Sequence, residues 1–131
     1  MIPLNYGGTG TMKYVYASRT GNVKSVINRL GLHQTALRLE DGNEIVDEDF
    51  ILFTYTDGYG DVPYVVDEFL KHNGKHIKGV IVSGDLEYDM AYCRAGDTIA
   101  YEYGCPLLYK FENEGTTRDL KRISEILGIT L

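Results

Sequence analysis

The sequence lacks the marks of several common protein classes. It contains no run of about eighteen apolar residues and no basic N-terminal region followed by an apolar one, so neither a membrane span nor a signal peptide is predicted. Positive charge is scarce, because 13 Lys and Arg stand against 19 Asp and Glu, for a net charge of −6. Nucleic-acid binders concentrate Lys and Arg, so this balance argues against such a partner and favours a basic protein surface.

Cysteine and metal-ligating patterns are also sparse. Cys93 and Cys105 form no C-x-x-C pair, which favours buried thiols in a reducing compartment and predicts a cytoplasmic protein. No histidine or second cysteine is placed in sequence to activate Cys93, so a structural thiol is favoured over a nucleophile. His33, His72 and His76 are scattered and no carboxylates group with them, so no metal site is predicted in this chain.

The most informative part of what is present runs from Tyr14 to Val23. It indicates a buried strand that opens through small hydroxylated residues into an amphipathic helix. Backbone N–H groups at the start of a helix lack intrahelical partners and therefore bind phosphate. Ser18 and Thr20 add hydroxyl donors, and Gly21 lets the backbone come close to the ligand. Neither G-x-x-x-x-G-K nor G-x-G-x-x-G occurs, so a monophosphate ligand is favoured over a triphosphate or dinucleotide. Taken alone, such hydroxyls are more often ordinary turn and cap residues.

Apolar runs rich in β-branched and aromatic residues predict five strands. They cover Lys13–Ala17, Thr35–Leu39, Phe50–Thr54, Gly79–Ser83 and Leu107–Phe111. Several runs are apolar nearly throughout, which is typical of parallel strands that helices cover on both faces.

Helical periodicity fills most of the gaps between these runs. The first predicted helix is Val23–Leu30, with Gly31 as its stop, and the second has Asp61 as its cap, Pro63 as its first residue and Leu70 in its last turn. The third is Arg94–Tyr103, before Gly104 and Pro106, and the fourth is Thr117–Leu127, before Gly128. Between the second and third strands, Glu40–Asp49 is too short, acidic and aperiodic for a full helix, so a loop is expected there.

This order of elements predicts a doubly wound α/β fold with a parallel sheet between two helical layers. Ligands of such folds bind beyond the carboxyl ends of the strands, at the point where the strand order reverses. The loops Tyr55–Val62 and Gly84–Cys93 are expected there beside the loop after the first strand. They are rich in Gly, Asp and Tyr, so they are candidates for holding an aromatic ring.

A single domain is expected, because 131 residues suffice for one hydrophobic core. We predict that this domain covers residues 12–131. Residues 1–11 contain three glycines and precede Met12, where the first strand is about to begin, so we interpret them as a flexible leader or an expression remnant.

Several further motifs occur in order along the chain. They are Ser18-Arg19-Thr20-Gly21-Asn22, the stretch Thr54 to Pro63, Ser83-Gly84, the stretch Ala91 to Asp97, Pro106, and Phe111-Glu112 followed by Gly115-Thr116. Together they resemble the NrdI family of small flavodoxin-like proteins of class Ib ribonucleotide reductase, over nearly everything from Met12 on. The resemblance implies a compact three-layer flavodoxin-like fold, with strand order 2-1-3-4-5 and a loop in place of the helix between the second and third strands.

The resemblance also implies an FMN cofactor, with its phosphate in the loop after the first strand and its ring between the loops after the third and fourth. The implied cofactor-binding residues are Ser18, Arg19, Thr20, Gly21, Asn22, Tyr55, Thr56, Asp57, Tyr59, Gly60, Ser83, Gly84, Asp85, Tyr88, Met90 and Ala91. Arg19 either pairs with the phosphate or points to solvent, and the sequence leaves both open. The candidates for stacking on the flavin are Tyr55, Tyr59, Tyr88 and Tyr92, although some of the 11 tyrosines must be ordinary surface or core residues.

For function, the resemblance implies that reduced flavin reacts with O2 and that a superoxide-type oxidant passes to the class Ib ribonucleotide reductase small subunit. That partner would use the oxidant to assemble its metal and radical cofactor, and a flavin or flavodoxin reductase would supply electrons. Such a protein is a flavoprotein activator and not a stand-alone metabolic enzyme. Two alternatives stay open: a short flavodoxin that carries electrons generally, and, ranked last, a cofactor-free interaction module or phosphorylatable receiver, which would need an acidic pair after the first strand.

The loop after the fourth strand departs from the family pattern at two positions. Asp85 stands where the family has Asn after Ser-Gly, and Asp89 stands where Gly is common. A carboxylate near the flavin disfavours an anionic hydroquinone, so Asp85→Asn is expected to raise the reduction potential of the flavin. The loss of a glycine at position 89 is expected to change how readily a peptide flips on flavin reduction.

Overall fold

The computed structural model describes residues 12–131, so the predicted leader over residues 1–11 lies outside the described residues. The five strands form one parallel sheet in the order β2-β1-β3-β4-β5, which confirms the predicted flavodoxin-like topology. The strands are β1 (Lys13–Tyr16), β2 (Leu37–Arg38), β3 (Phe50–Tyr55), β4 (Ile77–Gly84) and β5 (Leu107–Glu112). The helices are α1 (Asn22–Arg29), α2 (Tyr64–Asn73), α3 (Arg94–Tyr103) and α4 (Thr117–Leu127), with short 3-10 helices η1 (Gly74–His76) and η2 (Leu86–Ala91).

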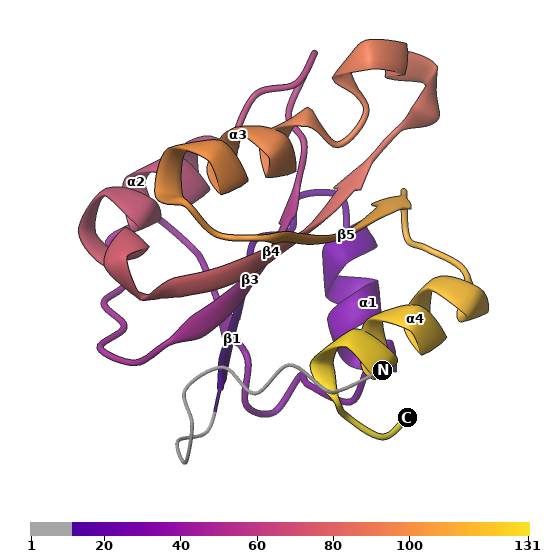
Figure 1. Cartoon of the computed structure of the whole chain (residues 1–131), viewed down its shortest axis with the longest axis horizontal. Coiled ribbons are helices and arrows are strands. Elements are labelled where there is room, and N and C mark those ends of the chain that lie inside the picture. Colours follow the sequence, from indigo (N-terminus) through magenta and orange to yellow (C-terminus); the bar gives the residue numbers. More distant parts are fainter. Residues whose placement is uncertain (1–11) are drawn as a thin grey trace.

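The sheet lies between two helical layers, with α1 and α4 on one face and α2 and α3 on the other (Figure 1). The central strand β3 shows why its sequence is apolar throughout. Phe50 and Leu52 belong to the core beneath α2 and α3, whereas Ile51 and Phe53 belong to the core beneath α1 and α4. All four side chains are fully buried, as expected of a parallel strand covered on both faces.

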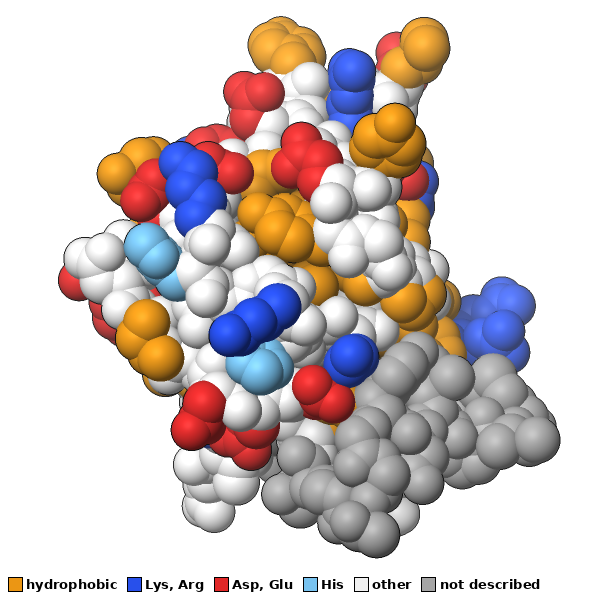
Figure 2. Space-filling view, turned by 60° about the vertical axis from the view of Figure 1, so that its left-hand side comes forward, with side chains coloured by type: hydrophobic (Ala, Val, Ile, Leu, Met, Phe, Trp, Pro, Cys, Tyr) orange, Lys and Arg blue, Asp and Glu red, His pale blue; other side chains and the backbone are white. Residues whose placement is uncertain are grey.

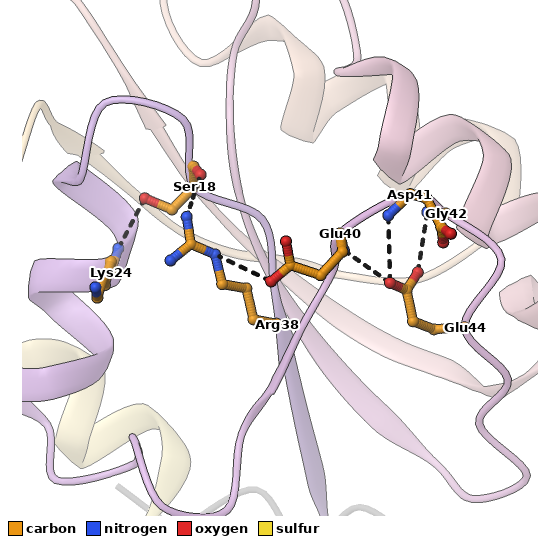
Figure 3. A network of polar contacts seen from close by, with 7 residues as sticks. All are labelled: Ser18, Lys24, Arg38, Glu40, Asp41, Gly42 and Glu44. Carbon is orange, nitrogen blue, oxygen red and sulfur yellow. Dashed lines mark hydrogen bonds and ion pairs between the residues drawn. The ribbon is translucent and has the colours of Figure 1, made fainter.

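The connection from β2 to β3 contains no helix, as predicted, and its backbone is held by side chains instead. The carboxylate of Glu44 accepts from the backbone N–H groups of residues 40–42, the shortest of these at 2.7 Å (Figure 3). The buried carboxamide of Asn73 on α2 accepts from the Val46 N–H and donates to the Glu44 carbonyl, both at 2.8 Å. These contacts satisfy polar groups that a helix would otherwise pair internally.

The two helices that follow β4 and β5 begin and end where the sequence predicts. α3 ends before Gly104, whose φ of 64° is easy for glycine, and α4 ends before Gly128 with a φ of 70°. α4 begins with a capping box, in which the Thr116 hydroxyl accepts from the Asp119 N–H and the Asp119 carboxylate accepts from the Thr116 N–H. α1 ends one residue early, at Arg29, and the predicted stop Gly31 follows with a φ of 75°.

Most of the remaining strand bounds differ from the prediction by one or two residues, and the start of α2 and the extent of β2 differ for identifiable reasons. Asp61 does not cap α2, because its backbone exchanges two 2.8 Å hydrogen bonds with Asp57, and Pro63 is extended, so the helix begins at Tyr64. The predicted strand Thr35–Leu39 shrinks to Leu37–Arg38. The N–H groups of residues 35 and 36 both bond to the Leu32 carbonyl and continue the preceding turn. η2 was not predicted, because its six residues are too few to show a helical periodicity. Across residues 12–131, the helices are all too short or too polar to cross a bilayer.

Candidate functional site

A cavity of about 190 Å³ lies at the carboxyl ends of the central strands, bordered by the loops after β1, β3, β4 and β5. Its lining consists of Arg19, Thr20, Asn22, Tyr55, Thr56, Gly58, Ser83, Gly84, Asp85, Tyr88, Ala91 and Asn113. Most of the residues that the sequence assigned to a cofactor therefore meet at one place. The assigned residues outside the lining are Ser18, Gly21, Asp57, Tyr59, Gly60 and Met90.

The loop after β1 leads into the N-terminus of α1. Gly21 occupies the position before the helix with a φ of 94°, and no acidic residue lies in the first turn. The backbone N–H groups of this turn have no intrahelical acceptor, so they present partial positive charge to the cavity that Thr20 and Asn22 line. The Ser18 hydroxyl accepts from the Lys24 N–H at 3.1 Å and closes the start of the helix. Ser18 thus pairs one N–H group of the first turn, and a contact of its hydroxyl with a phosphate stays a prediction.

Arg19 connects the loop after β1 to the loop after β3. Its guanidinium lies 2.9 Å from the Asp57 carboxylate and 5.4 Å from the centre of the Tyr55 ring. The Arg19 side chain is 61% exposed and lines the cavity, so pairing with a phosphate stays a prediction. Burial raises the pKa of Tyr55, with Arg19 lowering it and Asp57 raising it, so the phenol is neutral at physiological pH.

Thr56 lines the cavity and carries a buried, unpaired hydroxyl. Its Oγ1 is inaccessible to solvent and has no hydrogen-bond partner among the described residues. Leaving a buried hydroxyl unpaired costs about 1–3 kcal/mol, and most such groups in proteins are paired. A polar atom of a bound ligand would remove this cost once the neighbouring side chains moved to let it reach Oγ1, so Thr56 is a candidate ligand contact.

Tyr59 and Tyr88 approach each other across the outer part of the site. Their ring centroids are 5.0 Å apart, edge to face at 82°. A flat ring stacked between them would need about 3.5 Å on each side, so the two tyrosines must separate to admit one. Tyr59 is 79% exposed and is therefore free to move, whereas Tyr88 lines the cavity.

The loop after β5 supplies a residue that sequence reasoning missed. Asn113 lines the cavity with a φ of 52°, donates its N–H to the Gly84 carbonyl at 2.8 Å, and accepts from the Ser83 hydroxyl at 2.6 Å through its own carbonyl. The available signal was its place at the carboxyl end of a strand, together with the tolerance of asparagine for left-handed backbone. The second missed residue, Gly58, lies inside a stretch that was assigned.

Cys93 lies beneath the site and is fully buried, as the sequence predicted for a structural thiol. Burial raises its pKa to about 11, and its Sγ lies 3.5 Å from the Val82 carbonyl. A Cβ on Gly84 would lie 2.6 Å from the Cys93 backbone nitrogen, so glycine is required at that point. Within residues 12–131, no group of three His, Cys, Asp or Glu side chains is placed to hold a metal ion.

A family model described as NrdI flavodoxin-like matches residues 14–125. The chain belongs to this NrdI flavodoxin-like family. Two solved flavodoxins share the fold. A short-chain flavodoxin associated with a PDU bacterial microcompartment is 19% identical, with a TM-score of 0.65, covering 89% of this chain and 93% of that one. The flavodoxin of Streptococcus pneumonia TIGR4 is 25% identical, with a TM-score of 0.61, covering 89% and 97%.

Membership in the NrdI flavodoxin-like family implies flavin binding, and the cavity fits such a group. The start of α1 offers unpaired N–H groups without an opposing acid, as a phosphate requires. The buried hydroxyl of Thr56 offers a hydrogen bond to a polar atom. Tyr55 and Tyr88 provide aromatic surface in the same lining.

The two departures from the NrdI pattern have structural counterparts in η2. Asp85 lines the cavity and its carboxylate accepts from the Glu87 N–H at 2.9 Å, as a cap of η2. Asp89 has a φ of 47° and a ψ of −111°, a conformation that favours glycine, so the aspartate is held there under strain. Met90 follows and is 96% exposed, outside the cavity.

Proposed function

We propose that the chain binds FMN in this cavity, as a single FMN-binding domain over residues 12–131. The proposed binding residues are those implied by the family motifs, with Asn113 and Gly58 added from the cavity lining. Loop 18–22 would take the phosphate, and the loops after β3 and β4 would flank the ring. Bound FMN would supply the electron-transfer chemistry. The unpaired buried hydroxyl of Thr56, in a cavity of a NrdI flavodoxin-like protein, is the observation that carries this proposal.

We infer further that the protein reduces O2 and delivers a superoxide-type oxidant to the small subunit of class Ib ribonucleotide reductase. Family membership supports this partner. The rim of the site also suits docking of a protein, because exposed apolar side chains alternate there with acidic ones. The apolar members are Tyr59, Leu86 and Met90, and the acidic members are Asp61, Glu87 and Asp89.

The same mixture of side chains is visible on the surface. Figure 2 shows orange and red side chains next to each other at the upper end of the molecule, the end at which the loops after β3 and β4 lie in Figure 1. Acidic side chains would steer a basic surface of the partner toward the site, and apolar contacts would hold it there.

A flavin or flavodoxin reductase is the proposed electron donor. The buried free thiols support the cytoplasm as the proposed compartment.

The alternative function is that of a short flavodoxin that carries electrons between other proteins. Both structural neighbours are flavodoxins, and their chains are nearly fully covered by this one. Reaction with O2 separates the two functions. An electron carrier should reoxidise slowly in air, whereas an activator should reoxidise fast and release superoxide.

The test begins with a titration of FMN into the purified flavin-free protein, followed by anaerobic reduction and exposure to O2 with superoxide detection. We expect one FMN per chain, rapid reoxidation and superoxide release. The reduced protein should then generate the radical of a class Ib small subunit loaded with metal. Silent, slow reoxidation would favour the electron carrier, and failure to bind FMN would refute both functions.

A further inference from the structure

Arg38 reaches from the edge strand β2 to the loop that begins the site. It is in register with Tyr16 on β1 and lies with its guanidinium 6.0 Å from the centre of that ring. Its Nη2 donates to the Ser18 carbonyl at 3.1 Å (Figure 3). Its contact with Glu40 is longer, at 3.9 Å, and that carboxylate side chain is 76% exposed. The bond to Ser18 is therefore the firm polar contact of this arginine.

This bond sets the orientation of the first peptide of the loop. A trans peptide is planar, so the carbonyl of Ser18 and the N–H of Arg19 point in opposite directions. Holding the carbonyl toward Arg38 turns the Arg19 N–H away from it. The Ser18 hydroxyl meanwhile accepts from the Lys24 N–H in α1. Ser18 is thus fixed at two points, one on the edge strand and one on the helix.

Charge gives a second reason to single out Arg38. Arg19, the cation within the loop, is compensated by the Asp57 carboxylate at 2.9 Å. Among residues 12–131, the one carboxylate paired with Arg38 is that of Glu40, and this contact is longer and exposed, so more of the positive charge of Arg38 acts on the loop. An anion at the start of α1 would gain from this charge, whereas the uncharged part of a ligand would not.

We propose that Arg38 is a positioning residue for loop 18–22 and that it makes the site prefer a flavin with a phosphate over the same flavin without one. Arg38 acts through the Ser18 carbonyl and does not line the cavity. This inference rests on the proposed FMN function, and its test is arranged so that the two can fail separately.

The test compares FMN with riboflavin, which lacks the phosphate, in wild type and Arg38→Gln. Each flavin is titrated by the quenching of its fluorescence. We expect the substitution to weaken FMN binding about tenfold, since hydrogen bonds to charged groups have effects of this size, and to change riboflavin binding by less than about twofold. The matched control is Arg122→Gln on α4, which removes the same charge from an exposed side chain whose nearest carboxylate, Glu125, is 3.8 Å away. That control should leave the ratio of the two affinities unchanged.

A second measurement needs no flavin. Addition of inorganic phosphate should shift the amide resonances of residues 19–22 in wild type and much less in Arg38→Gln. If Arg38→Gln does not fold, Arg38→Lys replaces it. Lysine keeps the charge but loses the planar fork, so it should lower the ratio of FMN to riboflavin affinity by a smaller factor.

The possible failures are distinct. Suppose that wild type binds FMN, and that Arg38→Gln either weakens the binding of FMN and riboflavin equally or leaves both unchanged. The positioning role of Arg38 is then wrong, and the proposed function stands. If wild type binds neither flavin, the proposed function is wrong and the role of Arg38 falls with it.

Discussion

Replacing Thr56 by valine is expected to stabilise the flavin-free protein, although Thr56 lines the proposed binding site. The Thr56 Oγ1 is buried without a partner among the described residues, and such a hydroxyl costs about 1–3 kcal/mol. Valine puts a methyl group of similar size in its place and keeps the branch at Cβ, so the backbone preferences hardly change. We therefore expect the free energy of unfolding of the flavin-free protein to rise by about 1 kcal/mol.

The assay is urea denaturation of the flavin-free protein, followed by circular dichroism. Thr54 provides a matched control two residues earlier, on β3, because its hydroxyl is also buried but donates to the Tyr55 carbonyl at 2.9 Å. Thr54→Val removes an existing hydrogen bond, so the Tyr55 carbonyl loses one of its donors. It should lower the free energy of unfolding by about 1 kcal/mol. The two substitutions are chemically identical, so opposite changes in the free energy of unfolding would show that the difference lies in whether the hydroxyl is hydrogen-bonded.

Flavin binding supplies the other half of this prediction. If a polar atom of the ligand pairs with Thr56, Thr56→Val should weaken flavin binding about tenfold while it stabilises the free protein. The reasoning is refuted if Thr56→Val destabilises the flavin-free protein as much as Thr54→Val does. A stabilised variant with unchanged flavin affinity would show that the ligand leaves this hydroxyl unpaired.

Three further changes have defined outcomes. Asp89→Gly should raise the free energy of unfolding by about 1 kcal/mol in urea denaturation, since glycine relieves a strain of about 1–3 kcal/mol but adds about 0.5–1 kcal/mol of unfolded-chain entropy. Asp119→Asn should lower stability by about 1 kcal/mol at neutral pH, because its carboxylate holds the capping box and accepts from the Tyr109 hydroxyl at 2.6 Å. Although burial opposes ionisation, these hydrogen bonds lower the pKa of Asp119, so its contribution is present above the ordinary value of 3.8 and is lost as the pH falls below it. Asp85→Asn should raise the reduction potential of bound flavin by roughly tens of millivolts in spectroelectrochemistry, since about 1 kcal/mol of relieved repulsion equals about 20 mV in a two-electron couple.

Each of these has a contrary result. Glu87→Gly in the same short helix is the control for Asp89→Gly and should destabilise, so equal effects of the two substitutions would dismiss the strain at position 89. For Asp119→Asn, a stability difference from wild type that persists unchanged at low pH would show that the charge does not act. If the reduction potential is unchanged in Asp85→Asn, the Asp85 carboxylate does not contribute to that potential.

Most helices and strands could be predicted because their signals are local and repeated, whereas the strand order followed from the family resemblance. The apolar run of β3 requires cover on both faces, and the sheet provides it. α3 and α4 were placed correctly because glycine ends both helices. The start of α2 was misplaced, since the backbone pairing of Asp57 with Asp61 leaves no mark in the periodicity.

The site was predicted in outline, because three loops at one edge of a parallel sheet must converge. Its details depend on contacts between residues far apart in the sequence. Arg38 is 20 residues from Ser18, and Ser83 is 30 from Asn113, so neither pair can be deduced from local pattern. The unpaired state of Thr56 Oγ1 is likewise a property of its surroundings, which only the packed structure provides.

The shortness of β2 has a consequence for self-association. An edge strand offers free N–H and C=O groups to other chains, and long flat edges promote aggregation. At one edge of this sheet β2 has only two residues, which gives an incoming strand almost no template. At the other edge β5 has six residues, and the long charged side chain of Lys110 lies near its middle, paired with Asp97 on α3 at 3.1 Å; a lysine on an edge strand disfavours pairing with another chain. Both margins of the sheet are thus poor seeds for fibre growth, even in a protein whose central strands are apolar throughout.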